Sequence, residues 1–114
     1  MSVSFNGFNE SLLTFNAASG FTAEGVPVKM SADNTVNSCA DGDDFCGISE
    51  NVRNGYAAVS LSGAATLPYT GQAPVAGYAC LVANGAGGVK TASSGISRLI
   101  LSVDTVNSKV TFLV

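Results

Sequence analysis

Few residues of this chain have the types and the spacing that enzyme chemistry requires. The sequence contains no His, so the commonest general base at neutral pH is missing. A serine nucleophile would then need Lys or a carboxylate as its base. Lys90, close to Ser93 and Ser94, is the one local pairing, and no Ser-x-x-Lys dyad is present. We therefore expect a protein that is not an enzyme.

Two loops have compositions typical of ion-binding sites. The acidic loop, Asp41-Gly42-Asp43-Asp44, groups carboxylates as a Ca²⁺ loop does, but it lacks the bidentate Glu at the spacing of an EF-hand. The glycine-rich segment from Gly85 to Gly88 precedes Lys90, yet it has neither the P-loop spacing nor the dinucleotide-binding spacing. We interpret both as turns, and we expect no metal and no cofactor.

Three cysteines, Cys39, Cys46 and Cys80, are the other candidate ligands. Without His, a structural zinc site would have to take its remaining ligand from a carboxylate. Buried, reduced thiols are the favoured interpretation. Cys39 and Cys46 flank the acidic loop, and a disulfide between them stays open as an alternative if they face each other across a hairpin in an oxidising setting.

Partner classes can also be narrowed from composition. Tyr56, Tyr69 and Tyr78 are candidates for a sugar-stacking platform, but without Trp we favour packing in the core or at its rim. A net charge of -3 argues against nucleic acid, whose binding domains concentrate Lys and Arg. The apolar runs are far shorter than the roughly 20 residues that span a bilayer. We expect neither a nucleic-acid nor a membrane partner.

The elements that must position these residues are predicted to be short strands. Arg53-Asn54-Gly55 separates two β-prone runs, and Asn-Gly is the strongest short hairpin signal. Including the two strands of this hairpin, strands are expected in these segments: 25–30, 35–39, 45–52, 56–61, 64–69, 78–82, 89–92, 98–103 and 109–114. No segment has sustained helical periodicity, and no internal repeat is visible. The pattern predicts an all-β fold, a small antiparallel β-barrel or tulip-like sandwich with little helix.

The length of 114 residues fits one compact domain. We expect residues 1–20 to form an N-terminal arm or edge strand and residues 21–114 to form the β-barrel domain. The first segment is rich in large apolar side chains, namely Phe5, Phe8, Leu12, Leu13 and Phe15. It would either add a strand to a partner's sheet or form the first strand of the barrel itself. Neither a secretory signal nor a membrane span is apparent, so we expect synthesis and folding in the cytoplasm.

An ordered series of short segments carries a resemblance to a known class of proteins. The series is Gly25-Val26-Pro27-Val28-Lys29-Met30, Phe45-Cys46-Gly47-Ile48, Arg53-Asn54-Gly55-Tyr56-Ala57-Ala58-Val59, Gly63, Pro68-Tyr69, Gly77-Tyr78 and Gly85 to Gly88. The stretch from Gly25 to Lys90 resembles the small capsid decoration proteins, also called head-stabilisation or cement proteins, of tailed bacteriophages. The likeness rests on small residues and turns and includes no chemical motif.

The resemblance implies a virion structural protein that is assembled in the bacterial host cytoplasm. Such a protein binds the major capsid protein on the capsid exterior, often as a homotrimer, and clamps neighbouring coat subunits. The candidate capsid contacts are then Phe5, Phe8, Leu12, Leu13 and Phe15. Low ionic content suits surfaces that are buried in a permanent assembly. The alternatives are another virion part, such as a tail or head-completion subunit, and a carbohydrate-binding β module.

Overall fold

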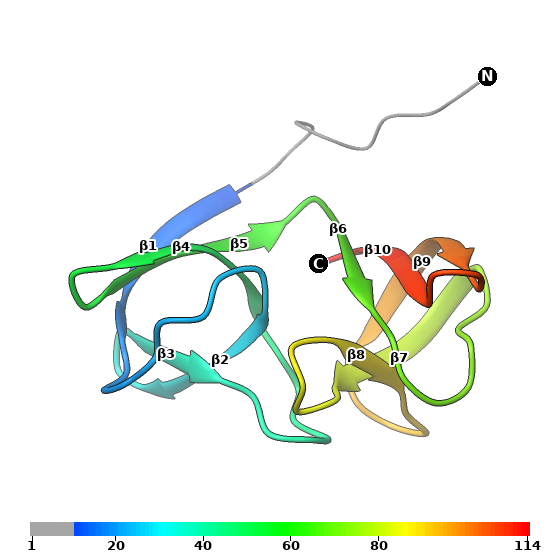
Figure 1. Cartoon of the computed structure of the whole chain (residues 1–114), viewed down its shortest axis with the longest axis horizontal. Coiled ribbons are helices and arrows are strands. Elements are labelled where there is room, and N and C mark those ends of the chain that lie inside the picture. The colour runs from blue at the N-terminus through cyan, green and yellow to red at the C-terminus, as the bar shows by residue number, and fades with distance from the viewer. Residues whose placement is uncertain (1–10) are drawn as a thin grey trace.

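The computed structural model describes residues 11–114, which contain strands and no helix (Figure 1). The expected all-β class is therefore confirmed. In chain order the strands are β1 (Ser11–Ala17), β2 (Pro27–Ala32), β3 (Thr35–Ser38), β4 (Gly47–Arg53), β5 (Tyr56–Ser62), β6 (Ala64–Pro68), β7 (Gly77–Ala83), β8 (Val89–Thr91), β9 (Ser97–Asp104) and β10 (Lys109–Leu113).

Strands β1 to β5 close into a barrel in the order β1-β3-β2-β4-β5 (Figure 1). All neighbouring strands run antiparallel except β1 and β3, which are parallel and pair only at Asn16 and Ala17. Alternate residues point inward, as strand geometry requires. The inward side chains that form the barrel core are Phe21, Val28, Val36, Ala57 and Val59.

The hairpin between β4 and β5 turns at Asn54 and Gly55, as the sequence predicts. Both residues have positive φ, 56° and 78°. A type I′ turn requires this backbone conformation at its two central residues. Arg53 pairs with Tyr56 directly across this turn. Local turn chemistry therefore sets the register of the two strands next to the turn, and a β-bulge shifts that register between Ser49 and Asn51.

The second sheet has the order β6-β10-β9-β7-β8. Its two outer strands meet at one point, where Tyr69 forms a parallel bridge with Val89 and the Thr70 N–H donates to the Val89 carbonyl at 3.1 Å. This approach requires glycine at position 88, because a Cβ there would lie 2.3 Å from the Pro68 carbonyl oxygen. The second sheet therefore curls around its own core until its outer strands, β6 and β8, meet at this one bridge.

The two halves of the chain share one connectivity, although the sequence shows no repeat. In each half the first strand pairs with the fifth, the fifth with the fourth, the fourth with the second, and the second with the third. The third strand then meets the first in parallel, through a short ladder in the first half and the single bridge in the second. Backbone pairing does not depend on particular side chains, which is why the repeat cannot be read from the residues.

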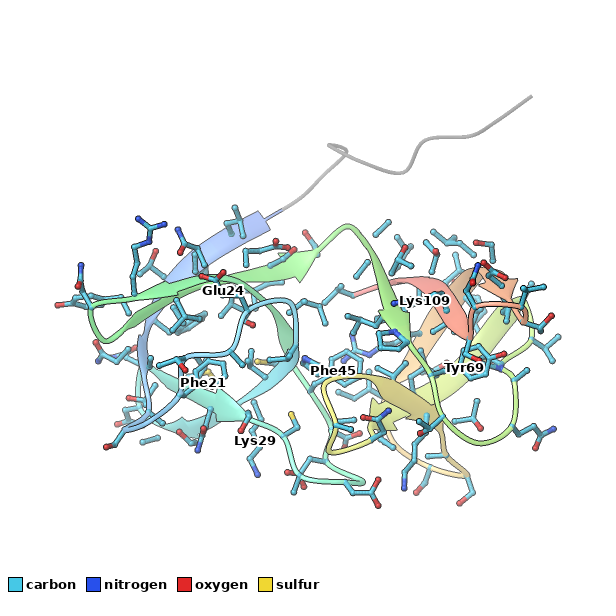
Figure 2. The ribbon with its side chains drawn as sticks, in the orientation of Figure 1. Phe21, Glu24, Lys29, Phe45, Tyr69 and Lys109 are labelled. Atoms are coloured by element: carbon cyan, nitrogen blue, oxygen red, sulfur yellow. The ribbon has the colours of Figure 1, made fainter. Side chains whose placement is uncertain are left out.

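A joint core ties the halves together. Phe45 precedes β4 of the barrel and Ile48 lies near the start of that strand. Both side chains are nevertheless buried in the core of the second sheet. The Phe45 ring meets the Phe112 ring edge-on, with 5.9 Å between centroids. Figure 2 shows Phe45 lying between the barrel and the second sheet. The second sheet therefore completes its core with side chains from the first half.

Candidate binding surface

Three of the five predicted contact residues lie on β1, and the other two, Phe5 and Phe8, lie outside the described residues. Leu12 and Leu13 are 55% and 51% exposed, whereas Phe15 is half-buried against the barrel core. Leu13 pairs with Val59 of β5, and a β-bulge lies between Ser11 and Leu12. The structure therefore brings Leu12 and Leu13 to the surface and places Phe15 in the barrel packing.

The strand that carries these leucines is only partly covered. β5 pairs with β1 along its length, whereas β3 reaches only Asn16 and Ala17. Within residues 11–114, no other strand pairs with the segment from Leu12 to Phe15 on the β3 side. An exposed strand edge with apolar side chains is a template for adding another strand.

A groove of about 400 Å³ lies beside Leu12, between the barrel and the second sheet. We call it the junction groove. Its lining residues are Leu12, Gly25, Ile48, Glu50 and Ala64-Ala65-Thr66-Leu67. They come from three strands, β1, β4 and β6, and from the segment that precedes β2. Among the lining residues within 11–114, Glu50 is the one charged side chain, and the lining combines polar and apolar groups in similar measure.

Of these lining residues, sequence reasoning identified only Leu12 as a candidate. The others are Gly, Ala, Thr, Ile and Glu, types that are common in any β domain. They converge only because the second half packs against the first. The Ala64-Ala65-Thr66 run, small and uncharged directly after Gly63, is the one local sign that another chain could approach this strand closely.

The acidic loop is held by two lysines, one from each half. Lys29 on β2 lies 2.6 Å from Asp43 Oδ2, and Lys90 on β8 lies 2.9 Å from Asp41 Oδ1. The Ala83 N–H donates to the Asp43 carbonyl, which docks the loop on β7. No group of three or more candidate metal ligands occurs within residues 11–114. The loop is therefore a brace between the halves.

The pKa shifts in this loop follow from the same contacts. The hydrogen bond from Lys29 and that from the Ala40 N–H lower the pKa of Asp43. In turn, the hydrogen bond to Asp43 and its charge raise the pKa of Lys29. Each shift favours the charged form of its group, so the pair is an ion pair at neutral pH.

Arg98 links the two halves from within the core. Its guanidinium is buried, donates to the Phe45 carbonyl, and lies 4.0 Å from the centre of the Phe45 ring. Burial lowers the pKa of Arg98, and the charge of Asp44 partly opposes that shift. A buried cation over an aromatic face is a favourable arrangement. Arg98 is thus a structural residue that fixes the segment leading into β4.

The structure gives the catalytic and phosphate-binding candidates internal partners. The Lys90 ammonium is bound to Asp41, and none of the hydrogen bonds found within residues 11–114 joins it to Ser93 or Ser94. In the glycine-rich segment, the Ala86 and Gly88 N–H groups donate to the Asn84 side-chain oxygen. These donors are therefore occupied and do not form a phosphate cradle.

The three cysteines are free thiols. Ser38 and Gly47, which adjoin Cys39 and Cys46, both pair with Val28, one from each side. β2 therefore lies between the two cysteines, so they do not face each other across a hairpin. Two strand spacings of about 4.8 Å put their backbones beyond the roughly 7 Å that a disulfide spans. The structure thus favours the reduced interpretation.

The tyrosines do not form a shared platform. Tyr69 is buried, whereas Tyr56 and Tyr78 are 57% and 78% exposed. Tyr56 begins β5 in the barrel, whereas Tyr78 lies on β7 in the second sheet. The placement agrees with core or surface packing and offers no stacking pair for a sugar.

Comparison with known proteins leaves the surface as the main guide to function. No family model matches the chain, and no curated protein matches it at a significant level. Over residues 11–114, no helix is long and apolar enough to cross a membrane. The arrangement offers exposed leucines on β1 and a groove that could contact another polypeptide.

Proposed function

We propose that this protein is a non-enzymatic structural protein of a bacteriophage virion. It binds the outside of the assembled capsid and stabilises the shell by clamping neighbouring subunits of the major capsid protein. The observation that carries the proposal is the surface of strand β1, on which Leu12 and Leu13 are about half exposed and Leu12 lines the junction groove. Such a surface suits contact with another polypeptide rather than with a small substrate.

Mass action supplies the stabilising mechanism. A protein that binds only the assembled lattice lowers the free energy of that lattice. A homotrimer presents three identical surfaces, and their combined avidity exceeds that of one contact. We propose this trimeric state for the protein on the capsid, with assembly in the cytoplasm of the bacterial host. The low ionic content, 11% charged residues, supports burial of its surfaces in a permanent assembly.

The rival functions have less support. A tail or head-completion subunit would use the same kind of polypeptide-binding surface, and it remains the nearest alternative. A carbohydrate-binding module needs grouped aromatic faces, whereas Tyr56 and Tyr78 lie on separate sheets. The polypeptide-binding function is therefore the better-supported proposal.

The test is co-sedimentation with purified capsids of the virus that encodes the chain. We expect binding to expanded capsids, little binding to unexpanded shells, and none to dissociated coat protein. The double substitution Leu12→Ser, Leu13→Ser should weaken binding at least tenfold, while Val106→Ser, at a side chain that is 90% exposed in the β9–β10 turn, should not. Absence of wild-type binding to every capsid form would overturn the proposal.

The contribution of the first ten residues needs a separate variant. Deletion of residues 1–15 would remove most of β1 and open the barrel, so lost binding would not be informative. Deletion of residues 1–10 leaves β1 intact and tests Phe5 and Phe8 alone. Unchanged capsid binding by this shorter chain would exclude those two phenylalanines as contacts.

A further inference from the structure

We propose that the junction groove accepts an extended peptide segment that carries a basic side chain and pairs, as an added strand, with the free edge of β6. The inference rests on the proposed function only in naming the source of that segment, which would be the capsid protein. Three features carry it: an open backbone edge, small and apolar side chains in the lining, and an acidic side chain at the rim.

The backbone edge follows from the register of β6. Ala65 and Leu67 pair with Phe112 and Val110 of β10, and the Tyr69 N–H donates to Ser108. In an antiparallel ladder, alternate residues direct both backbone groups to the same neighbour. The N–H and C=O groups of Ala64 and Thr66 must therefore point away from β10, toward the groove.

This edge has no partner strand within residues 11–114. β6 is an outer strand of its sheet, and β8 meets the chain only at Tyr69, beyond Pro68. Pro68 has no N–H to donate, so it limits the open edge to the segment from Ala64 to Thr66. The edge thus offers a short ladder, long enough to align a peptide of a few residues.

The lining residues suit a peptide backbone. Gly25, Ala64 and Ala65 are small enough to let another main chain approach, while the exposed Leu12 provides an apolar contact. The volume, about 400 Å³, falls in the usual range of ligand sites. An added strand would therefore gain backbone hydrogen bonds from one side and apolar burial from the other.

Charge decides which occupant fits. The exposed carboxylate of Glu50 favours a Lys or Arg on the peptide. Residues 1–10 contain no Lys or Arg and include Glu10, so they are a poor match. Lys29 and Lys90 are held in ion pairs and Arg98 is buried, which removes three of the five basic side chains that a second copy could offer. A basic segment of a different protein is the favoured occupant.

The test uses two synthetic probes, acetyl-Thr-Val-Lys-Val-Thr-amide and its Glu analogue, titrated into the full ¹⁵N-labelled chain. We expect the amide resonances of Ala64 and Thr66 to shift and the Lys probe to bind about threefold tighter than the Glu probe. Glu50→Lys should reverse that preference. The matched control Asp33→Lys, which changes an exposed acid in the β2–β3 turn, should leave the preference unchanged.

Three results would overturn the inference: no shift at Ala64 or Thr66 with either probe, no change of preference in Glu50→Lys, or shifts at these amides on deletion of residues 1–10 without any peptide. The last would mean that the chain's own segment occupies the groove.

Capsid binding separates this inference from the proposed function. If wild-type protein binds capsids and Glu50→Lys binds at least fivefold more weakly, both stand. If the two bind equally, the function stands and the capsid protein is not the source of the peptide. If wild-type protein does not bind capsids, the function fails whatever the probes show.

Discussion

At the scale of single residues, most of the charged side chains that form hydrogen bonds or ion pairs hold loops in place. Asp43 accepts hydrogen bonds from Lys29 and from the Ala40 N–H, and Asp104 accepts from Asn107 in the β9–β10 turn. The sequence predicts a solvated turn for the acidic loop, because the loop lacks the bidentate Glu and the other ligands of a Ca²⁺ site. Lys29 and Lys90 give no local signal of their role there, because both are distant from the loop in the chain. Only the folded arrangement places a lysine from each half on that loop.

Acid should weaken the protein partly through Asp43. Its pKa is lowered in the folded state by Lys29 and the Ala40 N–H, relative to the ordinary value of 3.8. The stabilisation is therefore fully present above pH 3.8 and is lost as the pH falls through the folded pKa. Urea unfolding of wild type and Asp43→Asn between pH 2 and 6 should show a smaller acid-induced loss in the variant. Equal pH dependence would contradict this role.

Cys39 should react slowly with alkylating reagents. Burial, followed by the charge of Asp43, raises the pKa of its thiol to about 11, so little thiolate exists at pH 8. We expect the rate of iodoacetamide labelling at Cys39, followed by mass spectrometry, to keep rising up to about pH 11. In Asp43→Asn the rate at pH 8 should increase. A plateau below pH 9 in the wild type would contradict the assignment.

At the scale of elements, most strands could be predicted because their signals are local. Asn54-Gly55 set a hairpin, and the strand expected at residues 25–30 overlaps β2. The pairing of β1 with β5 and β3 could not be predicted, because the segment lacks a clear alternation and its partners lie far along the chain. The two sequence-based interpretations of β1, arm or barrel strand, differ only in such long-range pairing.

The contact between β6 and β8 should depend on Gly88. A Cβ at this position would meet the Pro68 carbonyl oxygen at 2.3 Å, so Gly88→Ala should cost about 1–3 kcal/mol of unfolding free energy, as overpacking does. Amide exchange at Thr70, which donates to Val89, should accelerate most. Ala86→Ser in the same loop, at an exposed side chain, is the control with little expected change. Unaltered exchange at Thr70 in Gly88→Ala would contradict the prediction.

At the scale of the whole molecule, the two similar halves are joined by side chains of the first half that pack in the core of the second. Phe45 and Ile48 complete the second core, and the acidic loop binds a lysine from each side. The junction groove is formed by the same packing. It draws on four separate segments, so no local pattern could have revealed it, whereas the exposed Leu12 could be identified from sequence.

Phe45→Ala should destabilise both halves together. The variant loses the edge contact with Phe112 and the Arg98 contact, and truncating a buried Phe costs about 3–5 kcal/mol. Amide exchange should accelerate at Val59 in the barrel and at Val110 in the second sheet. Val106→Ala, at a side chain that is 90% exposed, should change stability by less than about 0.5 kcal/mol. Acceleration confined to Val110 would show that the halves unfold independently.

Because Phe45 and Ile48 belong to the core of the second sheet, they are synthesised before the strands that bury them. The barrel strands, residues 11–62, leave the ribosome before any residue of the second sheet, and domains fold as they emerge. Until β10 arrives, the Phe45 ring lacks its edge contact with Phe112. The nascent chain is therefore most prone to aggregate in that interval, and a pause after residue 62 would prolong the exposure.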